Sequence, residues 1–162
     1  MPSASDLLGD RRRVLVTGGA GFIGGAVVRR LLRETTVTVF NLDKMGYASD
    51  LSSIEEVLSE LGDAASDRHR LQQVDLTDAA ATEAAVKEAD PDLVMHLAAE
   101  SHVDRSISGP GVFIESNVNG TYNLLQAVRS HYEGLVGERR DVFRMHHIST
   151  DEVFGSLDAE GR

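Results

Sequence analysis

The sequence predicts a Rossmann-type α/β fold, in which helices cover both faces of a parallel sheet. Three observations support this prediction. Short apolar runs alternate with helical patterns along the chain, a glycine-rich turn follows the first apolar run, and polar side chains gather after the ends of the runs. Five strands wound in this way give the order 3-2-1-4-5, with a ligand crevice at the carboxyl ends of the strands.

The glycine-rich turn follows an expected strand over Arg13–Thr17 and precedes an expected helix from about Phe22 to Arg33. Its glycines stand at Gly18, Gly21 and Gly24. Backbone N–H groups at such a helix N-terminus bind a diphosphate, and a glycine one turn into the helix lets strand and helix approach closely. A glycine-rich turn without a ligand is the alternative, and the elements on either side of the turn favour the dinucleotide.

A second expected strand, over 36–42, ends at Asp43, which lies 19 residues after Gly24. That offset is close to the roughly 20 residues typical of a carboxylate that holds the adenosine ribose. Because a carboxylate repels a 2′-phosphate, Asp43 favours NAD over NADP. Lys44, the next residue, weakens that argument.

The rest of the chain continues the alternation. Further elements are expected as a helix over 51–61, a strand over 70–74, an Ala-rich helix with Thr77-Asp78 at its start and its end near Ala89, a strand over 93–99, a long helix over 111–132 and a strand over 142–149. Residues 1–12 are expected to be a loose polar leader, and residues 13–162 a single dinucleotide-binding domain.

Composition narrows the functional classes. The chain has 162 residues, a formal net charge of −10 and no cysteine. This charge disfavours a nucleic-acid surface, and the lack of cysteine excludes a disulfide framework and a cysteine metal site. The six histidines have no metal-ligand spacing, so no metal is expected, and His96 is expected in the core. With no apolar run of membrane length, a cytoplasmic protein is expected.

The end of the fifth expected strand carries Thr150, Asp151 and Glu152. A hydroxyl and two adjacent carboxylates can hold a substrate oxygen, donate a proton and accept one. The alternative is a helix N-cap, since threonine followed by acids begins many helices. Gly155 and Gly161 make a helix here unfavourable.

Five stretches together resemble the dTDP-glucose 4,6-dehydratases of the extended short-chain dehydrogenase/reductase superfamily. They are T-G-G-A-G-F-I-G, N-L-D-K-M-G-Y-A-S, H-L-A-A-E-S-H-V-D-R-S-I, N-V-N-G-T-Y-N-L-L and S-T-D-E-V-F-G-S-L. The resemblance covers nearly the whole chain after residue 12. The glycine motif is shared with many sugar-nucleotide epimerases, whereas the third and fifth stretches are more specific.

The resemblance implies roles for individual residues. Those implied to bind NAD are Gly18, Gly21, Phe22, Ile23, Gly24, Asp43, Lys44, Met45, Gly46, Asp75, Leu76, Leu97, Ala98, Ala99, Ser101 and Ser116. Ser101 and Thr150 are implied to contact the sugar nucleotide, Thr150 at the hydroxyl that is oxidised. Asp151 is implied to be the acid for the departing C6 hydroxyl and Glu152 the base at C5. The implied reaction oxidises C4, removes water across C5 and C6 and reduces C6, so that NAD is regenerated.

The sequence departs from the family pattern in one respect. The family requires a Tyr-x-x-x-Lys motif, and Tyr47, Tyr122 and Tyr132 have no lysine four residues later. The resemblance also implies later strands and a small substrate domain that are absent here, so the chain is expected to be an N-terminal portion without turnover of its own. A homodimer through the helix over 111–132 is a further implication.

Other functions remain open at this point. They are a UDP- or GDP-sugar dehydratase or epimerase, and a non-catalytic NAD-binding module. The adjacent carboxylates Asp151 and Glu152 argue against an epimerase, and the lack of a Tyr-x-x-x-Lys motif supports the module.

Overall fold

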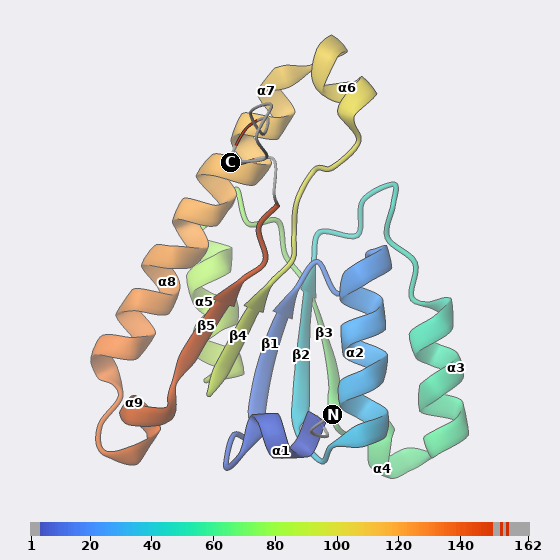
Figure 1. Ribbon diagram of the computed structural model, residues 1–162, viewed down its shortest axis with the longest axis vertical. Coiled ribbons are helices and arrows are strands. Elements are labelled where there is room, and N and C mark those ends of the chain that lie inside the picture. Colours follow the sequence, from blue (N-terminus) through green and yellow to red (C-terminus); the bar gives the residue numbers. More distant parts are fainter. Residues whose placement is uncertain (1–3, 151–152, 154, 156–162) are drawn as a thin grey trace, which may run out of the picture.

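The fold is built on a five-stranded parallel sheet with the order β3-β2-β1-β4-β5, as predicted. The structure is a computed structural model that describes residues 4–150, 153 and 155. The strands are β1 (Arg13–Thr17), β2 (Thr38–Asp43), β3 (His69–Gln73), β4 (Leu93–His96) and β5 (Arg144–His147). Figure 1 shows them side by side, with their carboxyl ends at one edge.

Helices lie on both faces of the sheet (Figure 1). In chain order they are α1 (Ala4–Leu8), α2 (Phe22–Glu34), α3 (Ser52–Leu61), α4 (Asp63–Ser66), α5 (Ala79–Ala89), α6 (Val103–Ser108), α7 (Pro110–Phe113), the π-helical η1 (Ile114–Gly120), α8 (Thr121–Gly134) and α9 (Glu138–Val142). The segments α7, η1 and α8 follow one another directly and form one long rod.

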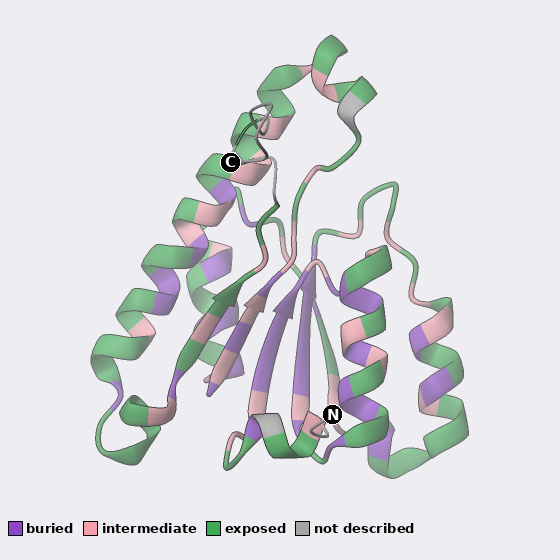
Figure 2. Cartoon of the chain, viewed as in Figure 1, coloured by how far each residue is buried: buried purple, intermediate pink, exposed green. Residues whose placement is uncertain are grey.

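Alternate residues of the central strand β1 supply the two halves of the core. Val14 and Val16 pack with α2 and α3, whereas Leu15 packs with α5 and α8. This arrangement follows from the period of two residues in a strand, which sends successive side chains to opposite faces. A strand covered on both faces is mostly apolar, and Figure 2 shows most of β1 and β2 buried. The two-sided core explains why V-L-V is uninterrupted by polar residues.

Several element boundaries differ from the predictions. The fourth strand ends at His96 rather than at residue 99, because its partner β1 ends at Thr17, opposite His96. The expected long helix is present, but residues 114–120 in its first half are π-helical. The expected polar loop after β4 contains the short helix α6.

The described part of the expected leader is ordered. Within it α1 forms a helix, and Leu8 is buried against the α2 side of the core. The Ser5 hydroxyl donates to the carbonyl of Glu34, and the Arg11 guanidinium donates to the carbonyl of Val142. These contacts join the segment to the amino ends of the strands. Among the described residues, none of the helices is long and apolar enough to cross a membrane.

The cap of α5 gives a direct test of the local sequence signals. Asp78 Oδ1 accepts a hydrogen bond of 2.9 Å from the N–H of Ala81, as the expected cap at Thr77-Asp78 requires. We expect Asp78→Ala to lower the free energy of unfolding by about 1 kcal/mol, the typical cost of losing such a cap. Urea denaturation measures the loss. Glu83→Ala, an exposed change in the same helix, should stay within about 0.5 kcal/mol, and equal losses in the two variants would contradict the capping role.

Candidate dinucleotide-binding site

The glycine turn has the geometry that a close approach of backbone to ligand requires. Gly18 has a φ of 70°, in the left-handed region, and its N–H donates to the carbonyl of Leu42 at 2.8 Å. A Cβ at Gly18 would lie 2.7 Å from the backbone of Ala98. A Cβ at Gly24 would overlap the carbonyl oxygen of Gly18. Glycine is therefore required at both ends of the turn.

The amino end of α2 is open at this edge of the sheet. Gly21 is its N-cap, and no side chain of the described residues caps the helix there. Phe22 and Ile23, the first two residues of α2, are exposed, with Phe22 95% exposed. The first N–H groups of a helix without a side-chain cap are donors for an anion. The positions implied for the diphosphate thus have the local structure that diphosphate binding needs.

Asp43 lies directly beside the glycine turn. Its Oδ2 accepts a hydrogen bond of 3.1 Å from the N–H of Ala20. Its Oδ1 accepts hydrogen bonds from the N–H of Met45 at 2.8 Å and the hydroxyl of Ser49 at 2.7 Å. Only 7% of Asp43 is exposed. The carboxylate is therefore held in one position at the end of β2, next to the turn.

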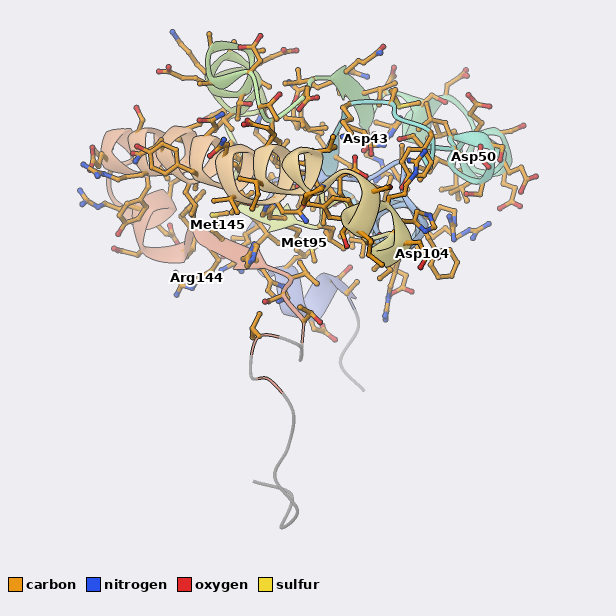
Figure 3. All side chains as sticks on the ribbon, turned by 90° about the horizontal axis from the view of Figure 1, so that it is seen from above. Asp43, Asp50, Met95, Asp104, Arg144 and Met145 are labelled. Carbon is orange, nitrogen blue, oxygen red and sulfur yellow. The ribbon has the colours of Figure 1, made fainter. Side chains whose placement is uncertain are left out.

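The segment after β2 reaches across to the segment after β4. Met45 has a φ of 57°, and this bend precedes Gly46. The Lys44 ammonium lies 2.6 Å from Glu100 Oε1 and donates to the hydroxyl of Ser116 at 3.3 Å. Figure 3 views the molecule from above, with Asp43 and Asp50 toward α3 and with Arg144 and Met145 of β5 toward the opposite edge of the sheet. Lys44 thus connects the segment after β2 to the loop after β4 and to η1.

A second contact joins the same two segments. The Arg105 guanidinium lies 3.8 Å from the centre of the Tyr47 ring, a cation–π distance. The rings of Tyr47 and His102 are 5.6 Å apart. Together with the Lys44–Glu100 ion pair, these contacts fix the segment after β2 against the loop after β4 and against α6.

The loop after β4 is held by the π-helical segment. The Asn117 side chain accepts from the N–H of Glu100 at 2.8 Å and donates to the carbonyl of Glu100 at 2.9 Å. The neighbouring positions of this loop that were expected to line the dinucleotide are Leu97, Ala98, Ala99 and Ser101, of which Ala99 and Ser101 are exposed. π-Helical segments are frequent at functional sites, and here the segment η1 carries Asn117 opposite the loop.

Asp75 and Leu76 follow β3 and lie under the same helical rod. Asp75 Oδ1 accepts from the N–H of Thr77 at 3.0 Å. Leu76 is 6% exposed, and its Cβ would be 3.1 Å from a Cβ at Gly120. The side chain of Asn123 donates to the carbonyl of Leu76 at 2.9 Å. Asp75 and Leu76 are thereby fixed at the edge where the adenine is expected.

His96 lies in the core at the carboxyl end of β4, as predicted. Its Nδ1 lies 2.6 Å from Thr17 Oγ1, and its Nε2 lies 3.0 Å from Thr121 Oγ1. Burial, with a smaller contribution from His147, lowers the pKa of His96 to about 4. The ring is therefore neutral at pH 7. The N–H of Ala98 donates to Thr17 Oγ1 at 3.3 Å, which joins the start of the loop after β4 to the end of β1.

Comparison with known proteins identifies the family of this site. The family model described as GDP-mannose 4,6 dehydratase matches residues 15–161. The chain belongs to that family. A dTDP-glucose 4,6-dehydratase of Neisseria meningitidis serogroup B is 51% identical over 146 residues, which are 90% of this chain and 39% of that protein. The chain therefore spans about two fifths of the length of the relatives it matches, and the resemblance to dTDP-glucose 4,6-dehydratases is confirmed.

Solved structures of similar proteins agree with the fold. The dTDP-glucose 4,6-dehydratase DesIV of Streptomyces venezuelae, solved with NAD and TYD bound, matches with a TM-score of 0.72 and 40% identity. That match covers 91% of this chain and 42% of DesIV. A UDP-glucose-4-epimerase of Stenotrophomonas maltophila with bound NAD matches with a TM-score of 0.71 and 28% identity, over 91% of this chain and 39% of the epimerase. Dehydratases and epimerases thus share this architecture.

The substrate side of the site is described only in part. Thr150 follows β5 and is exposed at the carboxyl-end edge. Asp151 and Glu152, the expected acid and base, lie outside the described residues. Among residues 4–150, 153 and 155, no group of three or more His, Asp or Glu side chains could hold a metal ion.

Sequence reasoning missed two members of this site. Glu100 and Asn117 were given no role, although both lie inside the stretches that resemble the dehydratases. The available signals were an acid directly after an expected strand and an amide in the second turn of an expected helix. Only the fold shows that Glu100 meets Lys44 and that Asn117 holds the backbone of Glu100.

Proposed function

We propose that this chain binds NAD and the sugar nucleotide dTDP-glucose, and belongs to an enzyme that dehydrates dTDP-glucose to dTDP-4-keto-6-deoxyglucose, a lyase reaction. The observation that carries the proposal is the placement of Asp43. Its carboxylate is bonded to the N–H of Ala20 within the glycine turn, so that the expected diphosphate site and the expected ribose site adjoin at one edge of the sheet. Relatives at about half identity are named for this reaction.

Different residues of this chain bind different parts of the cofactor. The open amino end of α2 accepts the diphosphate, and the wall formed by Leu97, Ala98 and Ala99 lies against the turn through Gly18. Asp43 accepts from the hydroxyls of the adenosine ribose. When bound, NAD supplies the oxidation of C4 and the reduction of C6 of the sugar.

The substrate roles rest on the sequence after β5. Ser101 and Thr150 hold the sugar nucleotide, Asp151 protonates the departing C6 hydroxyl, and Glu152 accepts the C5 proton. A ketone at C4 makes that proton acidic enough for a carboxylate to remove. Two carboxylates in different environments can keep the opposite protonation states that an acid and a base need.

An epimerase, or a dehydratase of UDP- or GDP-sugars, is the closest alternative, because an epimerase shares the fold at 28% identity. The pair Asp151 and Glu152 favours elimination over epimerisation. A non-catalytic NAD-binding module is the alternative of a different class. A homodimer is supported by apolar side chains exposed along α7, η1 and α8, namely Val112, Ile114, Val118, Tyr122 and Leu125. We expect the enzyme to be cytoplasmic.

Binding measurements on the chain test the cofactor assignment. We expect titration calorimetry to show binding of NAD⁺, and Asp43→Asn to weaken it by about tenfold, since the variant loses a charge-assisted hydrogen bond to the ribose. Asp67→Asn, an exposed change of the same kind away from the crevice, should bind NAD⁺ like the unchanged protein. Equal affinity in Asp43→Asn and the unchanged protein would contradict the role of Asp43.

Incubation with dTDP-glucose tests the reaction class. We expect the chain to bind the nucleotide without turnover, since its tyrosines are not followed by the lysine of a Tyr-x-x-x-Lys motif. Formation of a 4-keto-6-deoxy product, read by its absorbance in alkali, would refute the expectation of no turnover. Binding of NAD⁺ with no binding of dTDP, UDP or GDP would favour the non-catalytic module, and preference for UDP or GDP would favour the other sugar nucleotides.

A further inference from the structure

Lys44 is the residue that makes the choice between NAD and NADP ambiguous. It follows Asp43 directly, at the position where a cation could accept the 2′-phosphate of NADP. The structure shows where its charge is placed. The Lys44 ammonium lies 2.6 Å from Glu100 Oε1, and the side chain of Glu100 is only 10% exposed. The Lys44 side chain is 36% exposed, so solvent screens this ion pair less than a pair in which both partners are exposed.

The backbone of Glu100 is held on both of its polar groups. Asn117 bonds to its N–H and to its carbonyl, at 2.8 Å and 2.9 Å. The hydroxyl of Ser116 offers Lys44 a further acceptor at 3.3 Å. The segment that carries Lys44 is also held from its other end, since Arg105 lies over the ring of Tyr47 at 3.8 Å. Glu100 and Lys44 are thus positioned toward each other by contacts on both segments.

We propose that Glu100 is a specificity-determining residue, which favours NAD over NADP by keeping the Lys44 ammonium from a 2′-phosphate. The inference rests on the proposed binding of a dinucleotide at this edge. Asp43, held beside the glycine turn, and Glu100, paired with Lys44, then supply two negative charges against one ammonium, and a 2′-phosphate would meet a net negative charge. The hydroxyl of NAD brings no charge, and Asp43 can accept a hydrogen bond from it.

Removal of the Glu100 charge should change this preference. In Glu100→Gln, Lys44 keeps its charge and loses its ion-pair partner, so it becomes available to a phosphate. We expect the ratio of the NAD⁺ to the NADP⁺ association constants, measured by titration calorimetry, to fall about tenfold. The double variant Glu100→Gln/Lys44→Met should lose the increased relative affinity for NADP⁺, because it lacks the Lys44 ammonium.

Controls separate the inference from the proposed function. Glu115→Gln removes an equal charge from η1, the π-helical segment that contacts Glu100, but Glu115 contacts Asn119 rather than Lys44. The ratio of association constants should be unchanged in this variant. Glu100→Ala is the second variant if Glu100→Gln does not fold, as judged by thermal unfolding, and the same fall is expected in it. An unchanged ratio in a folded Glu100 variant that still binds NAD⁺ would overturn the role of Glu100 alone. Failure of the unchanged protein to bind either dinucleotide would overturn the proposed function, and the inference with it.

Discussion

Gly24→Ala should lower the free energy of unfolding by about 3 kcal/mol, at the upper end of the usual cost of forcing an extra methyl group into a packed site. A Cβ at Gly24 would overlap the Gly18 carbonyl oxygen, lie 2.7 Å from the Gly18 carbonyl carbon and lie 2.9 Å from Gly19 Cα. All three are backbone atoms, so no flexible side chain can move aside. Relief requires α2 to shift away from the turn, and such a shift would also displace the N–H groups proposed to hold the diphosphate.

Gly25→Ala is the matched control for this prediction. It lies one residue further along the same helix and is also buried, but its Cβ would meet Arg29 Nη1 at 3.4 Å and the Gly19 carbonyl oxygen at 3.5 Å. Such distances are ordinary contacts. Since alanine favours a helix over glycine by up to about 1 kcal/mol, Gly25→Ala should be neutral or stabilising. Guanidinium denaturation of both variants measures the difference, and similar losses in the two would show that the close approach at Gly24 is not the cause.

The contrast between these neighbours illustrates what could be predicted from the sequence. The spacing of Gly18, Gly21 and Gly24 after an apolar run reflects local geometry, and it predicted the turn, β1 and the start of α2. The position of Asp43 followed from the same unit of strand, glycine turn, helix and second strand. The number of residues in the helix and the second strand of such a unit varies little. Strand order followed from the right-handed crossover of parallel strands.

Features that depend on contacts between distant segments could not be predicted. The meeting of Lys44 with Glu100 joins residues 56 positions apart, and no local pattern gives the conformations of both loops. The π-helical turns of η1 have no distinct hydrophobic period, so the helix over 111–132 gave no sign of them. The early end of β4 depends on where β1 turns away, which is a property of the partner strand.

The buried His96 makes the stability of the fold depend on pH. The imidazole is 1% exposed, and burial is the main reason that its pKa is lowered from 6.5 to about 4. Between these two values the unfolded chain binds a proton that the folded chain does not, so acid favours unfolding. The stability that His96 contributes is therefore complete above pH 6.5 and is lost as the pH falls toward 4. Burial also lowers the pKa of His69, with a smaller effect of Arg70, which adds in the same direction.

We expect the free energy of unfolding to fall, through His96 alone, by about 2 kcal/mol between pH 7.5 and pH 5. Urea denaturation over this range, on the unchanged protein and on His96→Gln, isolates the effect, because carboxylates titrate in both proteins and cancel in the difference. His96→Gln should be less stable at pH 7.5, where it loses the imidazole packing and at least one bond to Thr17 or Thr121, yet show the shallower pH dependence. His131→Gln serves as a control for the removal of a histidine and should keep the steep dependence. Parallel curves for His96→Gln and the unchanged protein would mean that the ring takes up a proton while the fold stays intact, and that the bonds to Thr17 and Thr121 do not require it to be neutral.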